Sequence, residues 1–252
     1  MRVVTFRVLF DNFVFVLEDE ASDAVAVVDP GEALPVLTRY ARAGRRLDAI
    51  LVTHFHSDHV GGVGDLLEEF PGAPVIGGAG EKGRIPGQTV RVSDGDEVVA
   101  AGARARVLEV PGHTRGHVAY FFPDAAGDGG DLFSGDTIFG GTVGNIFEGT
   151  PEDMFRAVQK IRALPIGTRI WCAHEYTLQY VREAAGLDPG NARLAERLRR
   201  LEAASRTAPT VPLLLEEERA TNPFFRWDDP ALAAHHGTAP GEATFRRLCD
   251  IT

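Results

Sequence analysis

The sequence predicts an α/β fold in which a strand-rich part, residues 1–174, is followed by a smaller helical part, residues 175–252. Three observations predict this organisation. Short runs of β-branched and aromatic residues recur up to residue 174, with few segments of helical spacing between them. Beyond residue 174, helical spacing prevails. The composition, 44% hydrophobic and 25% charged residues over 252 positions, is typical of a globular protein.

The elements up to residue 53 are predicted from apolar runs and from helical spacing. They are strands at 3–10, 13–18, 24–28 and 48–53 and a helix at 32–44. Asp11-Asn12 is a favourable turn pair, so we expect the first two strands to form a hairpin. The strand at 48–53 has the continuous apolar character of a buried strand, and it ends directly before His54.

The rest of the chain alternates short strands with helices and then becomes helical. Further strands are predicted at 74–76, 131–134 and 169–173, and helices at 60–70, 151–163, 176–185, 192–204, 213–218 and 243–248. Between residues 88 and 122 the apolar runs are short and broken by glycine and proline, which favours an antiparallel or mixed sheet. Leu194, Leu198 and Leu201 share one helix face, and we expect them to pack against the first part.

Charge and apolar content exclude several classes of protein. Lys and Arg number 26 and Asp and Glu 36, which gives a net charge of −10. Such a surface repels phosphate backbones and anionic lipid, so neither nucleic acid nor a membrane is expected as a partner. No run approaches the ~18 apolar residues of a membrane span. The N-terminus lacks the apolar core of a signal peptide, and two cysteines make no disulfide framework, so the expected compartment is the cytoplasm.

Histidines gather at the end of the strand at 48–53. The segment Thr53-His54-Phe55-His56-Ser57-Asp58-His59 holds three of the chain's eight histidines and one aspartate. Neutral imidazoles and carboxylates are ligands of zinc and its first-row neighbours. The alternative is a loop of polar surface residues. Three downstream residues oppose that alternative, because each follows an apolar run that could present it at the same sheet edge: His113, Asp136 and His174.

These segments together supply seven candidate metal ligands. They are His54, His56, Asp58, His59, His113, Asp136 and His174. One tetrahedral metal cannot use so many, so the sequence predicts two adjacent metals that share a carboxylate. A further histidine, His117, is expected to pack or to make an outer hydrogen bond and not to bind metal.

The pattern His-x-His-x-Asp-His, followed by separate His, Asp and His residues, resembles the metallo-β-lactamase superfamily. Within it, the chain is most similar to glyoxalase II, the hydroxyacylglutathione hydrolases. The narrower matches are Asp11-Asn12-Phe13, Phe133-Ser134-Gly135-Asp136-Thr137, Phe147-Glu148-Gly149-Thr150, Ala173-His174-Glu175-Tyr176-Thr177 and Thr221-Asn222-Pro223-Phe224. They extend from residue 11 to beyond 220, so the resemblance covers nearly the whole chain.

The resemblance implies an αββα sandwich with two metals at one edge of its sheets. It implies a catalytic domain at 1–174 and a helical substrate-binding domain at 175–252. The implied ligands are His54, His56 and His113 for the first metal, Asp58, His59 and His174 for the second, and Asp136 as the bridge. The implied cofactors are two divalent ions, zinc first, with iron or manganese as alternatives. Asp58 and Asp136 are then the expected catalytic residues.

The implied activity is hydrolysis of the thioester of a 2-hydroxyacyl thiol such as S-lactoylglutathione, which releases the thiol and the hydroxy acid, as in methylglyoxal detoxification. Two metals can activate water for this reaction. The thiol leaves without a strong general acid because its pKa is about 8.5. No cysteine nucleophile is needed, and Cys172 is expected to be a buried strand residue. The expected partner is this small thioester, bound by a monomer.

The chain departs from the family pattern where glutathione would be held. The family binds this tripeptide through a basic residue in a glycine-rich loop, a tyrosine after the last metal histidine, and basic residues near the C-terminus. Asn145 stands where the loop cation is expected, and Phe147 where an aromatic hydroxyl is frequent, whereas Tyr176 is retained.

The C-terminal cations expected from the family are also replaced. Cys249 and Thr252 stand at those positions, and Arg246 or Arg247 could compensate. The predicted substrate contacts are Tyr176, Asn145, Phe147 and Arg246. Losing two or three charge-assisted contacts of ~1.5–3 kcal/mol each would weaken glutathione binding by orders of magnitude.

Other interpretations stay open at this point. The same chemistry could act on a non-glutathione low-molecular-weight thiol carrier. A persulfide dioxygenase of the superfamily would use a single iron and would not need Asp58, His59 and His174. A non-catalytic binding module would be expected to have lost a ligand, and none is missing. Counting metals and measuring oxygen consumption separate the two kinds of enzyme.

Overall fold

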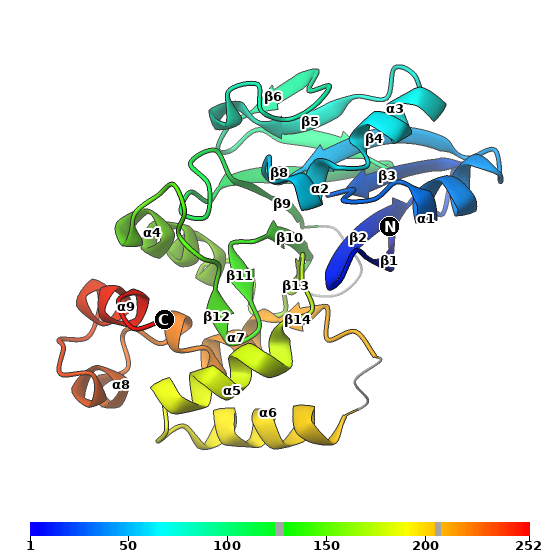
Figure 1. Cartoon of the computed structure of the whole chain (residues 1–252). Helices are drawn as coiled ribbons and strands as arrows, with labels where there is room; N and C mark the ends of the chain where they lie inside the picture. The colour runs from blue at the N-terminus through cyan, green and yellow to red at the C-terminus, as the bar shows by residue number, and fades with distance from the viewer. Residues whose placement is uncertain (124–128, 205–207) are drawn as a thin grey trace.

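Two β-sheets packed face to face form the centre of the molecule (Figure 1). The computed structural model describes residues 1–123, 129–204 and 208–252. Within those residues, both sheets have six strands. The first has the order β1 (Arg2–Val8), β2 (Asn12–Glu18), β3 (Ala24–Val28), β4 (Arg46–Val52), β5 (Val75–Gly78) and β6 (Val90–Val92). The second has the order β14 (Leu213–Leu214), β13 (Arg169–Cys172), β10 (Asp131–Gly135), β9 (Val118–Phe122), β8 (Ala103–Glu109) and β7 (Glu97–Ala100).

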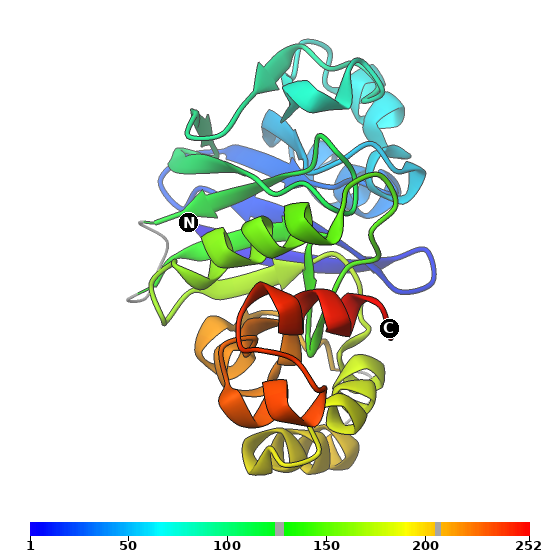
Figure 2. The ribbon, with the colours of Figure 1, turned by 90° about the vertical axis from the view of Figure 1, so that its left-hand side faces the viewer.

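Helices cover the outer faces of both sheets (Figure 1, Figure 2). Those beside the first sheet are α1 (Leu34–Val36), a π-helical turn at Leu37–Ala41, α2 (Ser57–Val60) and α3 (Val63–Glu69), and α4 (Pro151–Arg162) covers the second sheet. The start of α4 is fixed by a capping box, in which Thr150 Oγ1 accepts from the Asp153 amide and the Asp153 carboxylate accepts from the Thr150 amide. The predicted αββα sandwich with a helical C-terminal region is thereby confirmed.

Strand β2 shows why the central strands read as continuous apolar runs. Phe13, Phe15 and Leu17 point into the core between the two sheets. Val14 and Val16 point the other way, into the layer beneath the helices. Since successive side chains of a strand alternate between its faces, a strand covered on both sides has no polar face.

The helix predicted over 32–44 is shorter in the structure. It consists of α1, with three residues, and the π-helical turn that follows. The wider turn buries Tyr40, whose hydroxyl donates to Glu18 Oε1 at 2.8 Å. Helical spacing predicted the segment but not the change of helix type within it.

The C-terminal region holds α5 (Thr177–Leu187), α6 (Ala192–Ala203), α7 (Leu215–Thr221), α8 (Pro230–His235) and α9 (Glu242–Cys249). The expectation that the leucine face of α6 packs against the first part is wrong. Leu194, Leu198 and Leu201 pack on Val181 and Ala184, because α5 lies between α6 and the sheets. The predicted helix at 213–218 is also partly wrong. Its first two residues form β14, which pairs antiparallel with β13 and so joins the tail to the second sheet.

A small hairpin links the tail to the loop after β10. Its strands are β11 (Ile138–Phe139) and β12 (Thr142–Val143). The Gly141 amide donates to Glu218 Oε2 at 3.0 Å, and Asn222 Nδ2 donates to the Thr142 carbonyl at 3.0 Å. Arg197 Nη2 donates to Glu218 Oε1 at 2.5 Å, and both side chains are buried. A buried ion pair of the tail therefore holds the hairpin in place.

Among the residues described, no helix combines the length and apolar character that crossing a bilayer requires.

Candidate metal centre

The predicted ligands come together at the ends of strands from both sheets. Those that follow β4 are in a loop and in α2, and the others each follow a separate strand of the second sheet or its extension. In chain order they are His54, His56, Asp58 and His59 after β4, His113 after β8, Asp136 after β10 and His174 after β13. Strand ends that meet at one edge explain why residues as far apart as 54 and 174 lie side by side.

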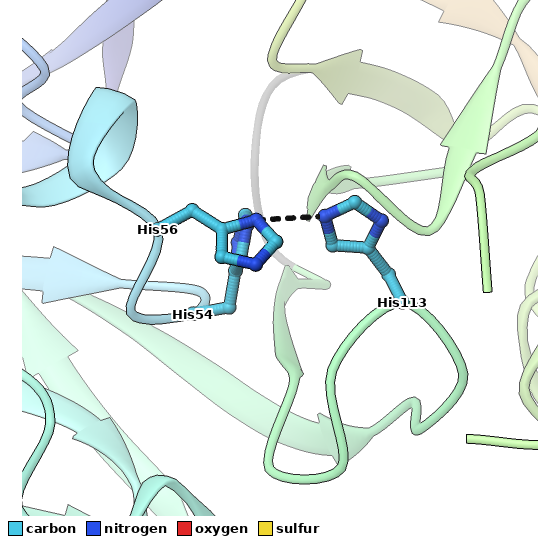
Figure 3. A group of neighbouring side chains, drawn as sticks. All are labelled: His54, His56 and His113. Atoms are coloured by element: carbon cyan, nitrogen blue, oxygen red, sulfur yellow. Dashed lines mark hydrogen bonds between the residues drawn. The ribbon is translucent and has the colours of Figure 1, made fainter. Parts of the chain in front are cut away.

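The first cluster is formed by His54, His56 and His113, whose ligand atoms all lie within 4.8 Å of one another. Figure 3 shows the three imidazoles turned toward a common point, with His56 Nδ1 3.0 Å from His113 Nε2. Burial lowers the pKa of each of these side chains. They are therefore neutral at pH 7, and their nitrogen lone pairs are available to a cation.

The second cluster is formed by Asp58, His59 and His174, whose ligand atoms also lie within 4.8 Å of one another. Asp58 Oδ2 lies 3.3 Å from His174 Nε2 and 3.4 Å from His59 Nε2. Burial opposes the charged form of His174, but hydrogen bonds with the Asp136 and Asp58 carboxylates outweigh it and raise its pKa to about 10. The electrostatic field of this cluster thus favours a positive charge within it.

Asp136 lies between the two clusters. Its Oδ1 is 3.4 Å from His59 Nε2, and its Oδ2 is 3.4 Å from His113 Nε2 and 3.5 Å from His174 Nε2. Burial opposes ionisation of this carboxyl, but the neighbouring His59 and His174 outweigh it and keep the pKa well below its usual value. One carboxylate therefore reaches ligands of both clusters, which is the geometry expected of a bridge.

Four of the five histidines have a polar group behind Nδ1, a hydrogen-bond partner for His54, His113 and His174 and a nearby carboxylate for His59. The pairs are His54 Nδ1 with Thr53 Oγ1 (3.1 Å), His59 Nδ1 with Asp29 Oδ2 (3.1 Å), His113 Nδ1 with the Asn145 carbonyl (2.8 Å) and His174 Nδ1 with Asp11 Oδ1 (2.8 Å). Such outer partners fix the tautomer and the orientation of histidines that bind metal. The arrangement points all four Nε2 atoms inward.

Sequence reasoning did not identify these outer partners as functional. Asp11 and Asn12 were expected to form a turn and belong to a segment that matches the family, but no contact with the metal ligands was expected of them, yet Asn12 Nδ2 donates to Asp58 Oδ2 at 2.9 Å. Asp29, with a φ of 48°, accepts from both the amide and the hydroxyl of Thr53 at 2.8 Å. The sequence offered one signal for Asp29, namely a polar residue directly after a buried strand. His117 makes an outer hydrogen bond, one of the two roles expected for it: its Nε2 accepts from the Asp136 amide at 3.2 Å.

Several inward atoms of the centre have no hydrogen-bond partner. Among the residues described, these include the buried atoms His54 Nε2, His59 Nε2 and Asp136 Oδ1. Buried polar atoms are nearly always paired, so unpaired lone pairs aimed at one point are what a bound cation would explain. Imidazole and carboxylate donors suit zinc, iron and manganese. The residues present thus fit a divalent metal centre.

The predicted substrate contacts are placed around this centre with one exception. Tyr176 stacks on His174 with ring centroids 4.8 Å apart, and the exposed Phe147 lies 5.1 Å from His113. Asn145 borders a small pocket next to the centre. Arg246 does not line that pocket; its guanidinium pairs with Glu152 at the start of α4. Cys172, by contrast, is fully buried as expected, and burial raises the pKa of its thiol.

Comparison with known families agrees with this site. Residues 8–174 match the metallo-beta-lactamase superfamily, and residues 175–251 match the hydroxyacylglutathione hydrolase C-terminus. The fold and the site therefore define a member of the metallo-β-lactamase superfamily. Proteins named hydroxyacylglutathione hydrolase from Gloeobacter violaceus and Synechococcus sp. (strain JA-3-3Ab) are 50% and 49% identical to it, each over 98% of this chain and 97% of the relative. The chain belongs to the hydroxyacylglutathione hydrolase family, and the predicted similarity to glyoxalase II is confirmed.

Solved structures agree on the fold. A metallo-beta-lactamase from Staphylococcus aureus subsp. aureus COL aligns with a TM-score of 0.71 and 20% identity over 99% of this chain and 66% of that one. The protein TTHA1623, solved in a di-iron-bound form, aligns with a TM-score of 0.61 and 26% identity over 89% of this chain and 100% of that one. The first shows the shared fold, and the second is a relative that holds two metals.

Proposed function

We propose that the chain hydrolyses the thioester of a 2-hydroxyacyl thiol, with S-lactoylglutathione as the first substrate to test. The observation that carries this proposal is the pair of ligand clusters that share Asp136, in a chain of the hydroxyacylglutathione hydrolase family. The chain would hold two divalent metals, zinc first, through His54, His56 and His113 on one side and Asp58, His59 and His174 on the other. We assign residues 1–174 to catalysis and residues 175–252 to substrate binding.

The metals, when bound, would supply an activated water and a positive charge beside the thioester carbonyl. The chain's own part is to prepare their site. Neutral His54, His56 and His113 offer lone pairs, while the ionised Asp58 and Asp136 supply negative charge. Asp58 is held by Asn12 at 2.9 Å, and its carboxylate can accept a hydrogen bond from the attacking water and orient it.

No side chain has to protonate the departing sulfur in advance, because a thiol of pKa about 8.5 leaves readily as the thiolate. This agrees with the position of Cys172, whose buried thiol is kept protonated and cannot act as a nucleophile. Tyr176, stacked on His174, would form one wall of the substrate site.

The test is release of free thiol from S-D-lactoylglutathione by metal-loaded protein, with chelator-treated protein as the control. Elemental analysis of the same sample gives the number and kind of metal ions per chain. We expect thiol release that depends on metal, with two ions per chain. Oxygen consumption with a persulfide, together with a single iron per chain, would instead support the dioxygenase. The complete second ligand cluster argues against that activity, because a single iron would not need it.

A further inference from the structure

An ion-pair network lies beside the first ligand cluster, on residues that the proposed function does not use. Its centre is Arg84, which follows the 3₁₀ turn Ala79–Glu81 after β5. Arg84 Nη1 and Nη2 donate to the two carboxylate oxygens of Glu148, at 2.5 and 3.1 Å. Nη2 also donates to Glu81 Oε2 at 2.8 Å, and Nε donates to the Glu81 carbonyl at 3.1 Å. One guanidinium therefore joins two carboxylates from distant parts of the chain.

The same guanidinium contacts the segment that carries His56, one of the two facing imidazoles in Figure 3. Its central carbon lies 3.7 Å from the ring centroid of Phe55, the residue between His54 and His56. A planar cation over an aromatic face is an attractive contact that depends on the flat shape of the guanidinium. The rings of Phe55 and His56 have centroids 4.8 Å apart. Arg84 therefore packs directly beside a ligand segment of the first cluster.

The two carboxylates extend the network to the segment that carries His113. Glu81, which is fully buried, accepts from Thr114 Oγ1 at 2.6 Å. Glu148 Oε2 accepts from the Arg115 amide at 3.0 Å, and the Glu148 carbonyl accepts from Arg115 Nε at 2.9 Å. Both residues that follow His113 are thus hydrogen-bonded to partners of the guanidinium.

The network contacts the first cluster and not the second. Within the described part of the chain, the hydrogen bonds, ion pairs and ring contacts of Arg84 and Glu148 involve no residue of the second cluster. The second cluster instead has the carboxylates of Asp29 and Asp11 beside its histidines. The two clusters therefore have separate supports, and a substitution can weaken one support without the other.

We propose that Arg84 is a positioning residue for the first metal site and that, by joining the segments of His56 and His113, it holds their imidazoles at the spacing that a metal needs. The inference deepens the proposed function and takes from it the two metals. Without the guanidinium, the metal would have to draw the two segments together on binding, and the free energy this costs would weaken its affinity. Lysine cannot replace the planar fork that fits two carboxylates and a ring at once.

The test measures the zinc affinity of each site separately, in the full chain, by competition with a chromophoric chelator. His174→Ala disables the second cluster and leaves the first site to be titrated, and His56→Ala does the reverse. Arg84→Met is made in both backgrounds and in the wild type. It removes the guanidinium but keeps an unbranched apolar side chain against Phe55.

We expect Arg84→Met to weaken zinc binding at the first site about 10–100-fold and to change the second site by less than about twofold. Arg84→Lys should weaken the first site by a similar factor. Glu148→Gln keeps the pair of Arg84 with buried Glu81, and it should weaken the first site about threefold to tenfold because its amide makes weaker hydrogen bonds than a carboxylate. Arg91→Met, at an exposed position of β6, is the matched control and should leave both sites unchanged.

Activity and stability supply two further readouts. Excess zinc should restore thioester hydrolysis by Arg84→Met to within about threefold of the wild type, since mass action fills a weakened site. Unchanged affinity of the first site in Arg84→Met and Glu148→Gln would overturn the positioning role. An equal loss at both sites, with a lower midpoint of urea unfolding, would overturn it as well, because Arg84 would then only stabilise the fold. A wild type that binds two zinc ions but hydrolyses no thioester would overturn the proposed reaction, whereas a selective loss at the first site would still support the positioning role.

Discussion

The metal centre and the pocket beside it differ in how many of their polar side chains have a polar partner within the chain. In the centre, four histidines each have a polar group beside Nδ1, and Asp136 lies between the two ligand clusters. Among the described residues that line the pocket, the one charged side chain is that of the exposed Glu183. The comparison teaches that the ligand geometry is fixed by buried hydrogen bonds, whereas the pocket beside it leaves its one charged side chain in solvent.

Removing the carboxylate shared by both clusters is the strongest test of that contrast. Asp136→Ala should lower kcat/KM for the thioester by on the order of 10³-fold or more, because the two metals that we propose would lose a common ligand. Asp65→Ala, at an exposed position of α3, is the matched control and should retain activity. Thiol release and metal content are measured on the same preparations. Activity within tenfold of wild type in Asp136→Ala would contradict the role of this residue as a bridge.

The buried ion pair behind the pocket is the next test, since it holds the β11–β12 hairpin that continues into the pocket wall. Glu218→Ala leaves the Arg197 guanidinium buried without its partner and should lower the free energy of unfolding by ~3–5 kcal/mol. Replacing both residues by Met should recover much of this loss. Urea unfolding measures the effect, and Glu216→Ala on the exposed side of α7 is the control. A small loss in Glu218→Ala would show that the hairpin is held by other contacts.

Predicting this architecture from the sequence worked where the signal is local and failed where it depends on contacts between distant segments. The ligands after β4 lie in one short segment, so their common role was visible. Asp29 acts on His59 and Thr53, more than twenty residues later, and no periodicity reports such a hydrogen bond. Likewise, the spacing of Leu194, Leu198 and Leu201 defines a helix face but not the partner that covers it, which is α5. β14, with two residues, is too short to produce any pattern.

Asp29 also tests how much the outer partners of the ligands contribute to the affinity for metal. In Asp29→Asn, the carboxylate that lies 3.1 Å from His59 Nδ1 is replaced by a neutral amide, while Asn tolerates the left-handed backbone at this position. Affinity for the metal in the second cluster should fall about 10–100-fold, as is typical when an outer partner of a ligand is lost. Competition with a chromophoric chelator measures the affinity. Asp48→Asn in β4, which removes the same charge away from the centre, should leave it unchanged.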